Sequence, residues 1–219
     1  MRVCLLLSCI TTVQRQRMLI DNIARDLRMY AEEGRGEEIV NLLGELSDST
    51  FDTMITTLDY RSGELPLHVA VRNGHGLGVL DHISTTRNGE ELIHVRTKGG
   101  YSALHLAALH GNIKAVEWLL SKHPPAADCN LPDEVSYNRP LHLAVRHGYK
   151  EVAARLVEAG ASLTLQNGEN MIPLGFCEDP QMFRALFSRI DNSRIENEMK
   201  YYREKLYPCK TILHYASLH

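Results

Sequence analysis

Residues 102–111 read Ser-Ala-Leu-His-Leu-Ala-Ala-Leu-His-Gly, and two closely similar phrases flank them. Residues 65–74 read Leu-Pro-Leu-His-Val-Ala-Val-Arg-Asn-Gly, and residues 139–148 read Arg-Pro-Leu-His-Leu-Ala-Val-Arg-His-Gly. The leucine before each histidine falls at positions 67, 104 and 141, so the intervals are 104 − 67 = 37 and 141 − 104 = 37. A fixed period of this size is typical of repeat architectures, in which each short unit packs on its neighbours.

The three phrases resemble the ankyrin repeat, whose mark is Thr-Pro-Leu-His-x-Ala followed by two short helices. Residues 102–111 have Ser and Ala in place of Thr and Pro, and they keep Leu-His-x-Ala. The resemblance is strongest over residues 60–167 and extends over 27–219. It implies an all-α solenoid of stacked helix-turn-helix units, with short β-hairpin fingers on one side and inner helices along a concave face.

The resemblance also divides the chain into segments. We expect residues 1–26 to form an N-terminal capping segment and residues 27–219 to form the repeat array. The predicted repeats are 27–58, 59–96, 97–133, 134–166, 167–208 with an insertion, and 209–219, which is incomplete. End repeats are expected to be atypical because one of their faces meets water. The last unit stops before its outer helix, so we expect the chain to be a fragment of a longer protein.

The helices are expected at regular places within these units. Inner helices are predicted over 65–73, 103–110 and 140–147, and outer helices over 113–121, 150–158 and 182–190. Residues 171–177 resemble the start of a fifth unit, in which Gly175 stands in place of the histidine. Trp118 is interpreted as a packing residue. Gly76 and Gly78 predict a short or mobile outer helix in the second repeat, because each glycine costs about 1 kcal/mol relative to alanine.

The 37-residue units exceed the usual family length of about 33 residues. We expect the additional residues around 85–92 and 126–137, in the segments after the outer helices. Insertions of this kind form loops on one face of a repeat array, often the face that binds a partner.

Composition narrows the class of protein. The formal charge of −3 gives no overall attraction to nucleic acid or to an acidic membrane. Five cysteines at irregular positions do not form a disulfide pattern, which favours the cytoplasm, with the nucleus or a host cytosol as alternatives. Residues 3–10 form an apolar run that is far shorter than the ~20 residues needed to span a bilayer. Two interpretations of this run stay open, a signal peptide and an element that covers the first repeat.

The 11 histidines raise the question of a metal or acid–base site. His68, His105, His142 and His214 hold the same place in successive units, and the resemblance implies a structural ladder of hydrogen bonds. Zinc needs four converging ligands, and units stacked in register do not obviously provide them. Motifs of metalloproteases, serine hydrolases and nucleotide-binding loops are missing. We therefore predict no catalytic residue, no cofactor and no metal, and we leave a Cys177–histidine pair open as an alternative.

The remaining candidate for function is the exposed surface of the array. The resemblance implies that the two residues before each turn glycine, together with finger residues, face the concave side. The predicted partner-binding residues are Arg61, Arg72, Asn73, Lys98, Tyr101, Leu109, His110, Asn138, Arg146 and His147. Arginine and tyrosine are enriched in binding hot spots, and the set is locally basic. The alternative is a solvated polar face with the partner elsewhere.

These observations predict a protein–protein interaction module that is not an enzyme. It would present a rigid concave surface and finger tips to another protein, as a peptide, loop or helix of acidic character. No nucleic acid, membrane span or metal is expected. The alternative is the targeting part of a larger enzyme, or of a secreted effector, with a catalytic domain beyond residue 219.

Overall fold

The computed structural model describes residues 93–121 and 128–188 without a break, together with 63–64, 66–74, 80–81 and scattered positions within 14–41 and 190–197. The chain divides into two compact units, Met1–Lys98 and Gly99–His219. The predictions for Arg61, for the outer helix with Gly76 and Gly78, for residues 1–12 and for the incomplete unit 209–219 lie outside the described residues.

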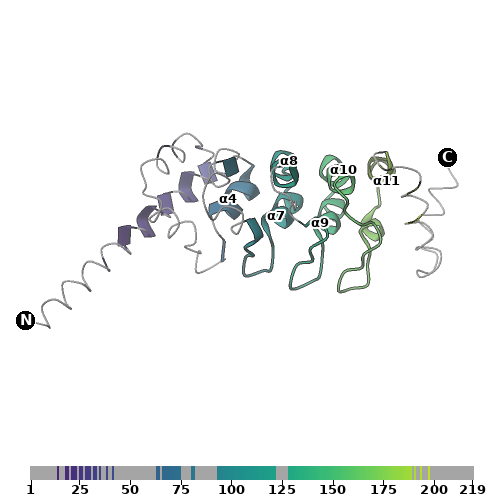
Figure 1. Cartoon of the computed structure of the whole chain (residues 1–219), viewed down its shortest axis with the longest axis horizontal. Helices are drawn as coiled ribbons and strands as arrows, with labels where there is room; N and C mark the ends of the chain where they lie inside the picture. The colour runs from purple at the N-terminus through teal and green to yellow at the C-terminus, as the bar shows by residue number, and fades with distance from the viewer. Residues whose placement is uncertain are drawn as a thin grey trace, which may run out of the picture. The chain divides into compact units, whose positions relative to one another are not determined.

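The second unit contains most of the described helices. They are α7 (Ala103–Leu109), α8 (Ile113–Ser121), α9 (Pro140–Arg146), α10 (Lys150–Glu158), the short 3-10 helix η1 (Pro173–Phe176) and α11 (Pro180–Phe187). The inner helix α9 contacts α7, α10 and η1, and the outer helix α10 contacts α8 and α11. Figure 1 shows the outer helices α8, α10 and α11 on one side of this unit, with α7 and α9 beneath them.

The first unit contains one described inner helix, α4 (Pro66–Asn73). Its side chains Leu67, Ala70 and Val71 are buried. Across the described residues of both units the regular structure is helical and no strand is assigned, so the all-α prediction is confirmed. The repeat boundaries stay a prediction.

The core of the second unit comes from the apolar positions that repeat with the helices. Leu104, Leu119, Leu141 and Leu156 are all fully buried between the inner and outer helices. Trp118 is only 7% exposed, which confirms its interpretation as a packing residue. A stack of this kind has no single centre, because each helix pair is buried only by its neighbours.

The turn after α7 requires a glycine. Gly111 has φ +70°, and a Cβ atom at this position would overlap the ring of Tyr149, which precedes α10. Both the left-handed backbone and the close approach of the ring exclude a side chain here. Gly111 thus allows the turn after α7 to pack closely against the residue that precedes α10.

Two loops of the second unit form fingers, residues 128–139 before α9 and residues 161–172 before η1. Figure 1 shows both loops projecting away from the outer helices. One short backbone hydrogen bond closes each tip, from Asp133 N–H to the Asn138 carbonyl (2.7 Å) and from Asn167 N–H to the Met171 carbonyl (2.8 Å). The fingers are therefore hairpin-like turns without strands.

The fifth repeat differs from the prediction. Its inner element is the single turn η1, and its outer helix α11 spans Pro180–Phe187 and not 182–190. Proline disfavours a helical conformation in the residue before it, and Asp179 is extended, with φ −101° and ψ 123°. Only the seven residues 173–179 are available for the inner element and its turn, whereas the ten residues 140–149 serve both in the preceding repeat. Asp179 then caps α11, because its side chain accepts the Gln181 N–H at 2.9 Å.

Candidate protein-binding surface

The repeated histidines fasten each inner helix to the loop that precedes the next inner element along the chain. Nε2 lies 3.1 Å from the Val95 carbonyl oxygen for His68, 3.2 Å from that of Asn138 for His105, and 3.1 Å from that of Met171 for His142. A carbonyl can only accept, so each Nε2 carries the hydrogen. All three rings are fully buried.

The other ring nitrogen is also occupied in the second unit. Nδ1 of His105 accepts the Ser102 N–H at 3.3 Å, and Nδ1 of His142 accepts the Arg139 N–H at 3.2 Å. Burial lowers the pKa of His142 to about 4, so this histidine is neutral at neutral pH. The expected ladder is present for His68, His105 and His142, and His214 lies outside the described residues. Among the described residues no group of histidine, cysteine and acidic side chains could hold a metal ion.

Cys177 does not suit the role of a nucleophile. Burial raises the pKa of its thiol to about 11, and the sulfur lies 3.5 Å from the carbonyl oxygen of Asp179. A nucleophilic cysteine needs its thiolate form, which such surroundings disfavour. The structure therefore gives no support to the Cys177–histidine alternative.

Buried polar side chains hold the two finger tips in shape. The carboxylate of Asp133 is buried and accepts the N–H groups of Val135 (3.0 Å), Ser136 (2.6 Å) and Asn138 (3.1 Å). Asn167 does the same in the next finger, where its side-chain oxygen accepts the N–H groups of Glu169 and Met171. Each tip is thus preorganised by one side chain that replaces missing strand hydrogen bonds.

The prediction that Asn138 binds a partner is corrected by its burial. We expected it at the surface as a partner-binding residue, but it is buried and its side-chain oxygen accepts the Asn167 Nδ2 at 2.8 Å. It links two fingers and leaves little of its own surface for a partner. Sequence reasoning also missed Asp133 and Asn167, although an Asp or Asn at the start of a turn is a recognised signal.

The second unit carries exposed residues at the ends of its inner helices. His110 follows α7, Arg146 ends α9 and His147 follows it; all three are exposed, and Leu109 and Tyr101 are half-exposed. The Arg146 guanidinium lies 5.2 Å from the centroid of the Phe176 ring. This is within the range of a cation–π contact. Phe176 was not predicted, because it is 30 residues from Arg146 in the sequence.

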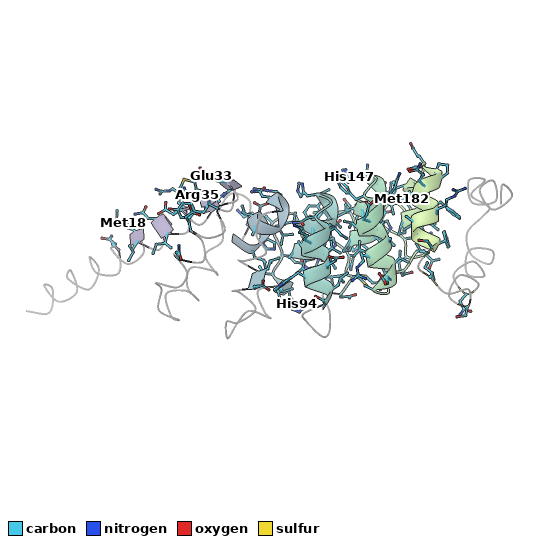
Figure 2. All side chains as sticks on the ribbon, turned by 90° about the horizontal axis from the view of Figure 1, so that it is seen from above. Met18, Glu33, Arg35, His94, His147 and Met182 are labelled. Carbon is cyan, nitrogen blue, oxygen red and sulfur yellow. The ribbon has the colours of Figure 1, made fainter. Side chains whose placement is uncertain are left out.

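Aromatic rings also support His147. Its ring stacks on that of Tyr149, with 6.3 Å between centroids and 21° between planes. Figure 2 shows His147 at one edge of the helices of this unit. We call His110, Arg146, His147 and Phe176, with the half-exposed Leu109, the basic face. Its arginine and aromatic side chains are of the kinds that contribute most to protein binding.

The first unit holds the other described candidates. Arg72 pairs with Glu64, whose two carboxylate oxygens lie 3.0 and 2.9 Å from its Nη1. Asn73 is half-exposed and Lys98 is exposed. The ion pair offsets the charge of Arg72, so this end of α4 is less basic than its sequence indicates. Sequence reasoning missed the pairing because Glu64 lies eight residues before Arg72.

Comparison with known families settles the nature of the repeats. The model described as ankyrin repeats (3 copies) matches residues 27–133 and 67–167, more than half of the chain. The chain belongs to the ankyrin-repeat family. As an ankyrin array, it contains repeats that serve as a protein-interaction module, which confirms the predicted class of function.

Several curated relatives share these ankyrin repeats. The poly [ADP-ribose] polymerase tankyrase of Caenorhabditis elegans is 37% identical over 124 residues, which is 50% of this chain and 5% of the relative. The SMC5-SMC6 complex localization factor protein 1 of Bos taurus is 26% identical over 178 residues, 74% of this chain and 16% of the relative. Protein phosphatase 1 regulatory subunit 27 of Homo sapiens is 38% identical over 74 residues, 34% of this chain and 46% of the relative. The ankyrin array thus spans less than half the length of each.

The described helices of the ankyrin array are not of the membrane-spanning type. Among the residues that the structure describes, no helix is both long and apolar enough to cross a bilayer.

Proposed function

We propose that the ankyrin array binds an acidic peptide, loop or helix of a partner protein through the basic face of its second unit. The carrying observation is the exposed Arg146, whose guanidinium rests on the Phe176 ring. An aromatic ring orients a guanidinium and leaves its N–H groups pointing outward, where a carboxylate can accept them in pairs. Tyr101, Leu109 and His110, which also belong to the second unit, add contact area. Arg72, Asn73 and Lys98 stay predicted partner-binding residues of the first unit by itself.

Rigidity supports this proposal. Arg146 and His147 end a helix, and each lies against an aromatic ring. Binding by such side chains costs less conformational entropy than binding by long side chains that are mobile in the unbound protein. The structural mechanism is therefore the presentation of a surface that already has its bound shape.

The names of the relatives are consistent with a non-catalytic role. One is a regulatory subunit and another a localization factor. The tankyrase likeness covers only the repeats, so it does not favour the alternative of an enzyme's targeting part.

Cys129 and Cys177 are both buried thiols, which supports the proposal of a reducing location such as the cytoplasm. The formal charge of −3 supports the exclusion of nucleic acid as the partner.

Affinity capture from cell extract tests the proposal. The wild-type array is compared with Arg146→Ala/His147→Ala, and with a matched control, Lys114→Ala/Glu151→Ala, at exposed positions of the outer helices. We expect the partner to bind wild type and control, to be lost from the first variant, and to bind more weakly as salt is raised. Circular dichroism checks that all three are folded. Equal capture by all three would contradict a site on the basic face.

A further inference from the structure

The tips of the two fingers in the second unit form a surface of a different character from the basic face. The first tip carries Glu134, Val135 and Tyr137, and the second carries Gly168 and Glu169; we call these five residues the finger-tip patch. Val135 is 71% exposed and Tyr137 is 57% exposed. Two large apolar side chains so exposed on one short turn are more informative than single exposed ones.

The two tips are joined directly. Gly168 N–H donates to the Ser136 carbonyl at 2.8 Å. A Cβ at Gly168 would lie 3.1 Å from that carbonyl oxygen and 3.5 Å from Cδ2 of Tyr137. The ring of Tyr137 therefore lies beside the backbone of the second tip. With Asp133 and Asn167 holding each turn, the patch is fixed in shape before any partner arrives.

Folding does not explain the tyrosine. Tyr137 has φ +54°, in the left-handed region that glycine and asparagine favour. The position five residues before each repeat histidine holds Gly63 and Gly100 elsewhere, with φ +66° and +76°. Tyr137 is 57% exposed, so burial offsets this strain only in part. Strained residues that fold stability does not require are found disproportionately at functional sites.

The two charged side chains of the patch itself are both acidic. Glu134 and Glu169 are both exposed beside the apolar pair. The nearby Arg139 directs its guanidinium to the carbonyl oxygens of Asn130 (2.9 Å) and Gln166 (2.8 Å), within the finger framework. An apolar centre flanked by carboxylates complements an apolar side chain flanked by lysine or arginine.

We propose that the finger-tip patch is a second docking site, which takes a basic segment of a partner protein with an aromatic or aliphatic side chain beside lysine or arginine. The apolar side chain packs on Val135 and Tyr137, and the basic groups pair with Glu134 and Glu169. The site uses no residue of the basic face and has the opposite charge preference. Either proposal can therefore fail without the other.

A phage-displayed library of random short peptides, panned on the full chain, tests this site. Phage that bind the variant Val135→Ser/Tyr137→Asn are first removed. This variant is chosen to stay folded, because asparagine tolerates the left-handed backbone. We expect the surviving peptides to pair Lys or Arg with Leu, Phe or Trp, and to bind the wild type at least about tenfold more tightly than this variant.

Two further variants separate the contribution of the carboxylates from that of the basic face. Glu134→Gln/Glu169→Gln should weaken the selected peptides and flatten the salt dependence, whereas Arg146→Ala/His147→Ala should bind them as the wild type does. Survivors rich in Asp and Glu, or no survivors, would overturn the proposal. Sedimentation velocity tests whether a second copy of this chain occupies the patch instead. Self-association of the wild type that is lost in Val135→Ser/Tyr137→Asn would show this, and that result would also overturn the proposal.

Discussion

At the residue scale, two turn glycines allow two energetic costs of a substitution to be measured separately, that of a left-handed backbone and that of a steric clash. Gly111 and Gly148 both follow an inner helix, with φ of +70° and +77°. A Cβ at Gly111 would meet the ring of Tyr149, whereas a Cβ at Gly148 would have no atom within 4 Å. The repeated phrase identifies both glycines equally well, but it does not tell which of them is packed.

We expect Gly148→Ala to lower the free energy of unfolding by about 1–2 kcal/mol, the cost of a left-handed alanine. Gly111→Ala should cost about 2–4 kcal/mol, because the displacement of Tyr149 adds an overpacking penalty. Urea unfolding followed by circular dichroism measures both. Equal losses would show that the Tyr149 ring moves aside without penalty.

Protonation of the buried histidines gives a second prediction at this scale. Burial lowers the pKa of His68 and of His142 from 6.5 to about 4. Between these values the unfolded chain binds protons that the folded chain does not, so stability is full above pH 6.5 and falls as the pH falls toward 4. The loss is at most about 1.4 kcal/mol per pH unit for each histidine.

Urea unfolding at a series of pH values measures this slope. His142→Gln can still form hydrogen bonds but does not titrate in this range, so its stability should depend less steeply on pH. His147→Gln, at an exposed position, controls for the removal of a histidine. A slope unchanged by His142→Gln would contradict the assignment.

At the element scale, the sequence predicts helices better than fingers. The outer helices α8 and α10 have the predicted bounds, 113–121 and 150–158, because their apolar spacing and flanking turns are local signals. The finger network could not be predicted in this way. Asn138 is buried by its bond to Asn167, 29 residues away, and Arg146 meets Phe176, 30 residues away. Partners at such distances become visible only when the stacking of units is known.

The fingers also carry a prediction at this scale. Asp133→Ala removes three hydrogen bonds from buried or half-buried N–H groups, and we expect a loss of about 2–4 kcal/mol. Asp133→Asn should cost less, because one side-chain oxygen can still accept the N–H groups of Val135 and Ser136. Urea unfolding ranks the two variants, and amide hydrogen exchange at 135, 136 and 138 reports the opening of the tip. Wild-type stability in Asp133→Ala would show that the carboxylate is not what holds the turn.

At the scale of the whole molecule, the second unit presents two surfaces of opposite preference on one framework. The basic face lies at the ends of the inner helices, and the finger-tip patch lies on the loops that precede the next helices. Both are carried by the same stacked units, so their spacing is set by the period of the array and not by a flexible linker. One partner with segments of both signs, or two partners, could be held at a defined separation.

The histidine ladder has a direction, because each described ring donates forward to the loop that precedes the inner element of the next repeat. Gly175 occupies the place of the next histidine, so the fifth unit has no ring that could donate such a bond. A designer who wishes to join foreign sequence to this array would cut after α11, where the junction breaks no ladder bond. A cut directly after α9 would instead leave His142 with a buried donor and no acceptor, a cost that any graft would have to repair.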